Sequence, residues 1–159
     1  MAAAGLLVLA VAFAVYKRRP LHRAEMIRGT IEGLTATNLE AAQQAVAEGL
    51  ALKPGDAGFE LDRLRILFRR EAYGEVLEAI DAIPPEARSL EHRILAAQSH
   101  AAMGRLDLAM AIVRELPAET ADNPGLALVR AQFAALQDQA DVVAKNVVIA
   151  ARAHPILEQ

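Results

Sequence analysis

Four histidines are the residues of this chain best suited to bind a metal ion, but their spacing argues against such a site. His22, His92, His100 and His154 fall in different segments. His92 and His100 stand about two helical turns apart, and no third ligand lies near them in the sequence. The chain has no cysteine, which excludes disulfides, thiol catalysis and cysteine-ligated zinc. The sequence therefore predicts no metal and no cofactor.

Residues suited to acid–base or phosphate chemistry show no catalytic arrangement either. Asp and Glu are spread along the chain in a pattern typical of solvated helix surfaces. No Ser, His and Asp stand in the context of a triad, and no glycine-rich loop follows a predicted strand. We therefore predict that the protein is not an enzyme and takes no small-molecule substrate.

One cluster of basic residues is a candidate for binding a partner. Arg63, Arg65, Arg69 and Arg70 lie close together in a segment expected to be helical. Two interpretations are open. The cluster is either an ordinary solvated helix face or a contact for an acidic partner segment or lipid headgroups.

The elements that position these residues are predicted to be helices throughout. Four amphipathic stretches each end at a proline; they are Thr37–Pro54, Ala72–Pro84, Arg105–Pro117 and Gln139–Pro155. Each stretch follows another helical segment; these are about Arg23–Leu34, Ala57–Arg70, Ser89–Met103 and Gly125–Gln137. The fold class is therefore predicted to be all-α, with about four helix pairs.

The helix pairs recur at a nearly fixed spacing. Their starts fall near Arg23, Ala57, Leu90 and Pro124, so that the period is about 34 residues. A fixed period with two helices per unit indicates a helical solenoid, in which neighbouring units complete one core. We expect one repeat domain over residues 20–159, with repeats at about 23–56, 57–89, 90–123 and 124–157.

The repeats resemble the tetratricopeptide repeat (TPR) family over nearly all of residues 23–157. The second helices carry a small or apolar residue early, an apolar residue one turn later and, in two repeats, a terminal proline; these are Ala42, Val76, Ala109 and Val143, then Val46, Ile80, Val113 and Val147, then Pro54 and Pro155. Small residues recur in the first helices at Thr30, Ala97 and Ala131, and Tyr73 stands where the family often has an aromatic residue. The chain departs from the pattern because it has no Trp and because Leu64 replaces a small residue. The resemblance implies a TPR-like superhelix.

The resemblance also implies where a partner would bind. In the family, the first helices line a groove that accepts an extended peptide or a partner helix. Transferred onto this sequence, the residues expected to contact a partner are Ile31, Leu61, Arg65, Phe68, Arg69, Gln98 and Gln132. The same wall would include Ile27, Arg28, Leu34, Asp62, Ile94 and Leu128.

The second helix of the last repeat is apolar on more than one face. Val143, Val147 and Val148 belong to this helix and are expected to contact a partner. Solenoids usually end in a polar capping helix, so an exposed apolar face here would mark a protein interface. The alternative is that Val147 and Ala151 pack inward and that the remainder is alanine-rich surface.

The N-terminus is predicted to be a membrane anchor. The apolar run Ala2–Tyr16 includes no charge and no amide, and Lys17, Arg18, Arg19 and Arg23 follow as a basic collar. A helix of that length spans roughly 22 Å, and snorkelling of the basic side chains brings the span closer to the ~30 Å of a hydrocarbon core. We expect one transmembrane helix over residues 1–19. A cleaved signal fits less well, because the charges follow the apolar run. A mitochondrial presequence also fits less well, because it would be amphipathic with Arg throughout, whereas this segment is uniformly apolar.

The distribution of charge indicates the orientation and the class of partner. The positive-inside rule places the N-terminus outside and residues 20–159 in the cytoplasm, which we interpret as a single-pass protein of a bacterial inner membrane. Residues 1–23 hold four of the 17 Lys and Arg residues and no acidic ones, so the rest of the chain carries 13 basic against 20 acidic residues. An acidic domain is a poor binder of nucleic acid. Proteins and membrane lipid are therefore the expected partners.

Two functions and a second placement remain open. The leading hypothesis is a scaffold or accessory subunit of a larger inner-membrane complex, docking on integral membrane proteins through its transmembrane helix and repeat surface. The alternative is a freestanding adaptor or assembly factor that captures peptide segments of client proteins. A periplasmic placement of the domain is disfavoured, because the positive charges follow the apolar run.

Overall fold

The described part of the chain consists of helices and short connections, which confirms the all-α prediction. The computed structural model describes residues 22–31 and 33–152. No strand is present in those ranges. The predicted anchor over residues 1–19 lies outside them, as do Lys17, Arg18, Arg19 and His154. Within the ranges described, no helix combines the length and apolar character needed to cross a bilayer.

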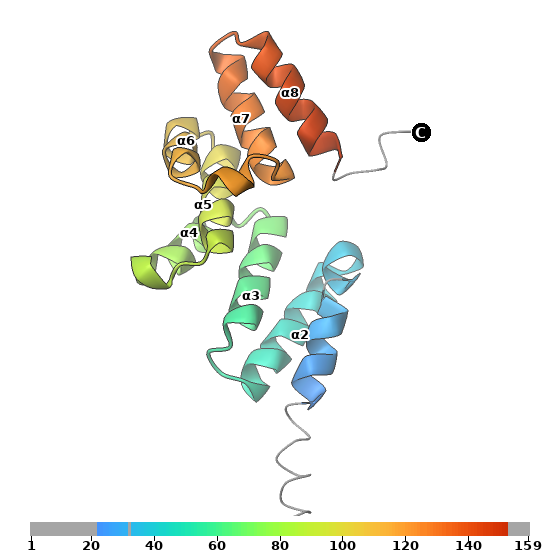
Figure 1. The fold of residues 1–159 in the computed structure, drawn as a ribbon. Helices are drawn as coiled ribbons and strands as arrows, with labels where there is room; N and C mark the ends of the chain where they lie inside the picture. Colours follow the sequence, from blue (N-terminus) through green and yellow to red (C-terminus); the bar gives the residue numbers. More distant parts are fainter. Residues whose placement is uncertain (1–21, 32, 153–159) are drawn as a thin grey trace, which may run out of the picture. The chain divides into compact units, whose positions relative to one another are not determined.

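The helices follow the predicted pairs closely (Figure 1). A first helical segment covers residues 22–31 and 33–37. It is followed by α2 (Leu39–Leu52), α3 (Ala57–Arg69), α4 (Tyr73–Asp81), α5 (Leu90–Ala102), α6 (Leu106–Arg114), α7 (Pro124–Leu136) and α8 (Ala140–Ala151). Two short 3₁₀ helices, η1 (Pro85–Ala87) and η2 (Ala118–Thr120), follow the prolines that end the predicted second helices of the middle repeats.

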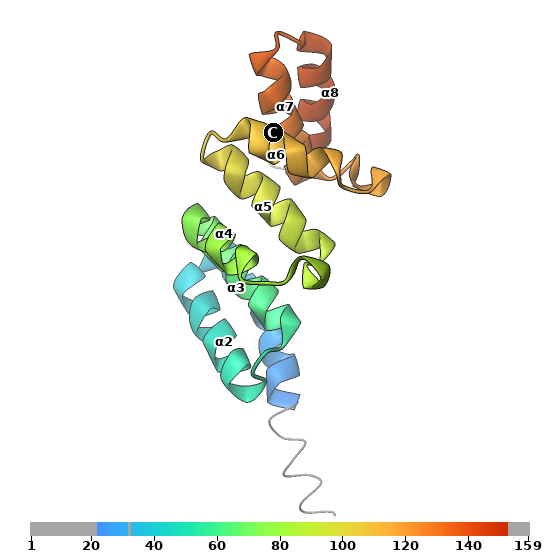
Figure 2. The same cartoon turned by 90° about the vertical axis from the view of Figure 1, so that its left-hand side faces the viewer.

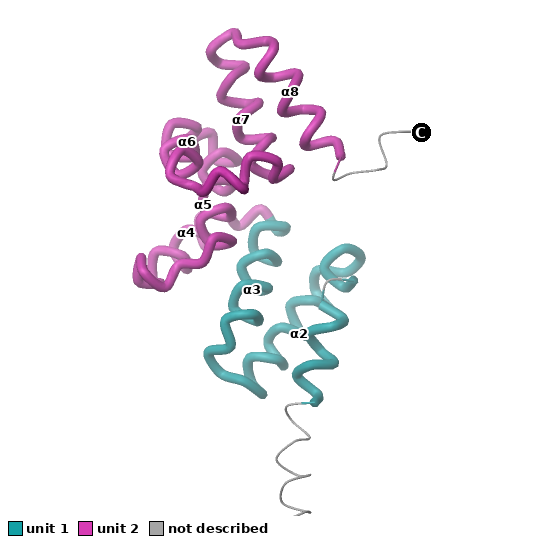
Figure 3. The backbone as a smooth tube through the Cα atoms, viewed as in Figure 1, with its two compact units in different colours: residues 1–70 teal, residues 71–159 magenta. Residues whose placement is uncertain are grey.

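The chain divides into two compact units (Figure 3). Unit 1 extends to Arg70 and unit 2 begins at Glu71. This boundary falls inside the predicted repeat 57–89, so α3 belongs to unit 1 and α4 to unit 2. The predicted repeats therefore do not coincide with the compact units.

Unit 1 is built around Phe59, which is fully buried. Its core also includes Ala24, Ile31, Ala42, Val46 and Ile66. Asn38 caps the start of α2, where its side-chain oxygen accepts a hydrogen bond from the Ala41 N–H at 3.0 Å. Such caps satisfy N–H groups that have no partner within the helix.

Unit 2 contains an internal duplication. The order α4–η1–α5 recurs as α6–η2–α7, shifted along the chain by about 34 residues. Ser89 and Asn123 occupy matching positions and cap α5 and α7 by accepting backbone N–H bonds. In the views of Figures 1 and 2, α7 and α8 lie side by side, as their close packing requires.

The turns between paired helices share one backbone conformation. Glu71, Gly104 and Asp138 all have positive φ, at 61°, 75° and 55°. Each residue stands between the two helices of a predicted pair. Because L-residues adopt this left-handed conformation only in special contexts, its recurrence supports a repeated helix–turn–helix unit.

The positions expected to be buried behave alike in three repeats and differently in the last. Ala42, Val76 and Ala109 are fully buried, and Val46, Ile80 and Val113 are also buried. In α8, by contrast, Val143 is only half-buried, Val147 is 49% exposed and Asn146 is buried. The inward packing of Val147 that the alternative interpretation required is therefore wrong. Thr30, expected at a close helix contact, is also exposed.

Candidate functional site

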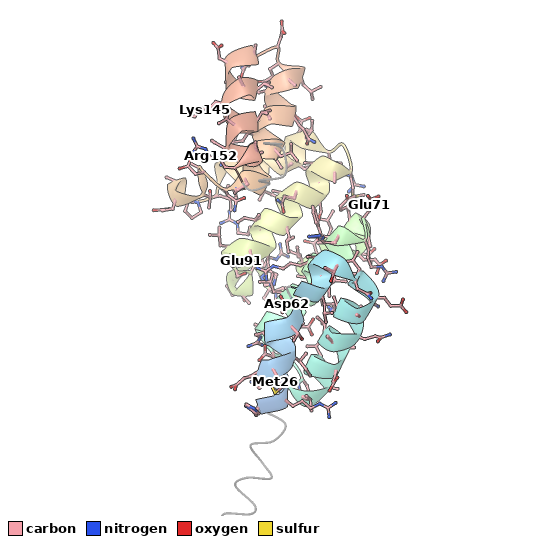
Figure 4. The ribbon with its side chains drawn as sticks, turned by 90° about the vertical axis from the view of Figure 1, so that its right-hand side faces the viewer. Met26, Asp62, Glu71, Glu91, Lys145 and Arg152 are labelled. Carbon is pink, nitrogen blue, oxygen red and sulfur yellow. The ribbon has the colours of Figure 1, made fainter. Side chains whose placement is uncertain are left out.

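Unit 1 contains a groove of about 770 Å³ between the first helical segment and α3. Four of the predicted partner-binding residues line it; they are Ile31, Leu61, Arg65 and Arg69. The remaining lining residues are Arg28, Thr35, Ala36, Gly58 and Asp62. Asp62, which is one of these lining residues, is labelled in Figure 4. Most lining residues of the first helical segment are three or four positions apart, and so are most of those of α3. This spacing places them on one face of each helix.

One end of the groove is fixed by the side chain of Arg28. Its guanidinium pairs with the Asp56 carboxylate and lies 4.5 Å from the centre of the Phe59 ring. Gly58 permits this approach, because a Cβ there would stand 2.8 Å from a terminal nitrogen of Arg28. The charge of Arg28 is therefore already matched within unit 1.

Asp56 links this ion pair to the start of α3. Its carboxylate accepts N–H bonds from Gly58 at 3.0 Å and Phe59 at 3.3 Å. Burial raises the pKa of Asp56, but the bond from Phe59 and the charge of Arg28 outweigh it, so the pKa lies below its usual value of 3.8. Asp56 is thus ionised at neutral pH.

The other end of the groove carries positive charge that is less completely matched. Arg65 pairs with Asp62 at 3.2 Å, and its side chain remains 52% exposed. Within the described ranges, Arg69 has no ion-pair partner, and its side chain is exposed. Three arginines and one aspartate line a groove that also contains the buried Ile31 and the half-buried Leu61. Such a surface is suited to a segment with both apolar and acidic side chains.

The remaining groove predictions fall elsewhere. Phe68 lies on α3, half-buried and not among the lining residues. Gln98 and Gln132 belong to unit 2, on α5 and α7, and do not line this groove. Sequence reasoning missed Thr35, Ala36 and Gly58. The spacing of Thr35, four residues after Ile31, was a usable signal, because it places both on one helix face.

A smaller hollow of about 390 Å³ in unit 2 contains two arginines that cap helix ends. Arg88 donates to the carbonyl oxygens of Ile83 at 2.9 Å and Asp81 at 3.2 Å. Arg93 donates to the Glu115 carbonyl at 3.2 Å. These bonds satisfy carbonyl groups at the ends of α4 and α6, so both guanidinium groups already have structural partners.

The structure describes the surroundings of two histidines, His92 and His100. His92 is buried, and its Nδ1 accepts a hydrogen bond from the Ser89 N–H at 3.0 Å in a capping box. Burial lowers the pKa of His100 below its usual 6.5, and Arg105 lowers it further against the opposing effect of Asp81. Among residues 22–31 and 33–152, no three His, Asp or Glu side chains are placed to hold a metal ion together.

The last helix presents the second predicted surface. Val147 and Val148 on α8 are 49% and 54% exposed, whereas Val143 is half-buried. Lys145 lies on the same helix, and Arg152 is the residue that directly follows it; both are labelled in Figure 4. Arg23, predicted in the membrane collar, lies on the first helical segment and pairs with Glu48 of α2.

The groove of unit 1 and the exposed face of α8 are therefore the two candidate surfaces for binding a partner. Each is a protein surface with apolar and basic side chains. Comparison with protein-family models, with curated proteins and with solved structures found no match to this chain.

Proposed function

We propose that the protein is a non-catalytic, membrane-anchored interaction module of a bacterial inner membrane. In this proposal it is a scaffold or accessory subunit of a larger complex and docks on integral membrane proteins. Residues 1–19 are the transmembrane anchor, and residues 20–159 are a TPR-like domain on the cytoplasmic side.

The groove of unit 1 is the observation that carries the proposal. It is open to solvent, its lining includes apolar side chains, and Arg69 has no ion-pair partner among the described residues. A charged side chain at the edge of an apolar groove can recognise an acidic group on a bound segment. A protein segment with acidic and apolar side chains matches both features.

The recurring helix pairs support the TPR-like part of the proposal. Left-handed residues at Glu71, Gly104 and Asp138 connect the paired helices at a regular spacing of about 34 residues. Helical repeats with this period usually act by binding other proteins on an extended surface. The basic residues at positions 17–19 and the apolar run before them support the membrane anchor.

The groove also favours a second candidate, an adaptor that captures peptide segments of changing clients. A groove of about 770 Å³ is large enough to bind a short extended peptide segment without help from another surface of the protein. The two functions differ in stoichiometry. A subunit remains with one complex, whereas an adaptor exchanges its clients.

Extraction in mild detergent followed by native gel electrophoresis and mass spectrometry tests the proposal. We expect the protein to migrate in fixed stoichiometry with one large complex. Migration as a monomer with variable traces of clients would favour the adaptor. A cytoplasm-specific reporter fused after Gln159 should be active, and activity of a periplasm-specific reporter there would overturn the proposed orientation.

A pair of charge reversals on α3 tests the groove itself. Arg69→Glu should release the protein from the complex, because it repels an acidic group in the groove. Arg63→Glu is the matched control, since Arg63 is on the same helix, pairs with Glu60 at 2.9 Å and does not line the groove. Equal retention of both variants would exclude the groove as the binding site.

A further inference from the structure

The duplication in unit 2 identifies the surface that holds α7. Helix α7 packs against both α5 and α6. The start of α5 at Leu90 and the start of α7 at Pro124 are separated by a certain number of residues. The starts of α6 at Leu106 and of α8 at Ala140 are separated by the same number. The face formed by α7 and α8 is therefore the counterpart of the face on which α7 itself is seated. We call it the α7–α8 face.

The burial of equivalent positions shows that none of the described helices covers the α7–α8 face in this way. On α6, Val113 is buried, and Leu106 and Met110 are half-buried and packed against the core. Their counterparts on α8 are all exposed. Val147 corresponds to Val113, Ala140 to Leu106 and Ala144 to Met110. Ala140, Ala144, Val147 and Ala151 recur at helical spacing, so they form one apolar stripe.

Helix α7 shows the same change relative to α5. Ala101 on α5 is buried, and its counterpart Ala135 on α7 is exposed. Ile94 is half-buried and packed in the core, whereas its counterpart Leu128 is 52% exposed. Both helices of the last pair thus leave open the positions that the preceding pair covers.

The contacts of α7 indicate what kind of segment fits. Gly125, near the start of α7, lies so close to Gln98 that a Cβ would stand 1.7 Å from the Gln98 amide nitrogen. Gln132 is the counterpart of Gln98 on α7 and is exposed. A helix seated on the α7–α8 face in the same way would need a small residue opposite Gln132.

One difference in residue type makes the α7–α8 face more apolar than the equivalent surface of α5 and α6. Arg114 of α6 lies over the ring of Phe133 of α7, 5.9 Å from its centre. Its counterpart on α8 is Val148, which is 54% exposed. The occupant should therefore present an apolar side chain, and no acidic one, at the position of Phe133.

We propose that the α7–α8 face binds an amphipathic helix of a partner protein, seated as α7 is seated on α5 and α6. The helix would have about the 13-residue length of α7, a glycine or another small residue in its first turn and an uncharged apolar stripe. Each helix in the described ranges already packs within its own unit, and residues 1–19 are the anchor in the proposed function, so the proposal assigns the occupant to another polypeptide. The inference rests on the proposed function and names a second contact for the same module.

A peptide copy of α7 is the direct probe of this face. The probe is a labelled peptide of residues 122–137 with Leu128→Lys and Gln132→Glu joined as a lactam. Both positions are exposed on α7, so the bridge holds the helix without occupying the seated side. Binding to the full chain in mild detergent is followed by fluorescence anisotropy. We expect saturable binding that weakens at least tenfold when the peptide carries Gly125→Leu.

Variants of the full chain locate the binding. Val147→Lys should weaken binding at least tenfold while circular dichroism shows the same helix content, because this position is half exposed. Leu108→Lys is the matched control: Leu108 is 52% exposed on α6 and lies outside the α7–α8 face, so binding should be unchanged. Absence of binding, or equal binding by the Val147→Lys chain, would overturn the proposal.

Two further outcomes distinguish a partner helix from a second copy of this chain, and the α7–α8 face from the groove. If the full chain sediments as a dimer that Val147→Lys dissociates, the occupant is a second copy and the proposal of a partner helix is wrong. Arg69→Glu should leave peptide binding intact, because Arg69 lies in the groove of unit 1. A failed peptide assay with Arg69-dependent retention in the complex would reject this inference and leave the proposed function standing.

Discussion

The ring of Phe59 occupies the space where a side chain at position 49 would begin. A Cβ on Gly49 would stand 2.4 Å from Cε1 of Phe59 and 2.6 Å from its Cζ. Gly49 lies within α2 and Phe59 in the first turn of α3, and both are buried. The close approach of these two helices therefore depends on the missing side chain at residue 49.

Gly49→Ala should destabilise the protein by about 1–3 kcal/mol, although alanine is the better helix former. Helix propensity alone favours the substitution by roughly 1 kcal/mol. The rigid Phe59 ring has no solvent-exposed direction in which to move, so overpacking outweighs that gain. Thermal unfolding followed by circular dichroism measures the change.

Gly74→Ala is the matched control for this prediction. Gly74 also lies within a helix, α4, but no neighbouring atom lies within 4 Å of the place where its Cβ would stand. It should raise the melting temperature slightly. An equal gain for Gly49→Ala would show that the two helices can separate without cost.

Replacing Asp56 should remove both a helix cap and an ion pair. We expect Asp56→Ala to cost about 1–2 kcal/mol. Asp56→Asn should cost less, because it keeps an oxygen that accepts the N–H bonds of Gly58 and Phe59. The comparison of the two variants by thermal unfolding separates the cap from the charge.

The charge contribution of Asp56 should depend on pH with a definite sign. The pKa of Asp56 in the folded protein lies below its usual value of 3.8, so the folded state binds its proton less readily than the unfolded state. The stabilisation is complete above the unfolded pKa and is lost as the pH falls through the folded one. The wild-type and Asp56→Asn proteins should therefore converge in stability in acid. A constant difference at all pH values would contradict this assignment.

The sequence was sufficient to predict the helices, because their patterns and breaks are local. Each predicted second helix ends near a proline or a short turn, and α2, α4, α6 and α8 appear in those places. The pairing of Arg28 with Asp56 was not predictable in this way. The two residues are 28 positions apart, and only the packing of the first helical segment on α3 brings them together.

The orientation of α8 was also beyond the reach of the sequence. Apolar residues cover more than one face of this helix, so periodicity does not determine which face turns inward. In the structure Asn146 is buried and Val148 is exposed, the reverse of their hydropathies. A choice of this kind depends on the neighbouring surface of α7.

At the left-handed turn positions, introducing glycine should raise the stability of the protein and removing glycine should lower it. Glu71→Gly and Asp138→Gly should each raise stability by about 0.5–1 kcal/mol, because glycine adopts positive φ without the steric cost of a Cβ. Gly104→Ala should lower stability by about 1 kcal/mol for the same reason. Gly104 has open space around it, so crowding would not explain a loss. Thermal unfolding that ranks Gly104→Ala as neutral would contradict the shared turn.

Asn146→Leu should stabilise unit 2 by about 1 kcal/mol. Asn146 is 6% exposed, and its amide donates to the Val142 carbonyl of its own helix at 2.8 Å. That bond returns little net free energy, whereas the buried amide loses its contacts with water. The counterpart of Asn146 on α6 is Ile112, which packs against the apolar core, so an aliphatic side chain suits the position.

Lys145→Leu is the control, because Lys145 is exposed and the change should stay within about 0.5 kcal/mol. A lower melting temperature for Asn146→Leu would mean that the amide bond holds α8 in its orientation, and the valines on its outer side would then be expected to shift inward when that bond is removed.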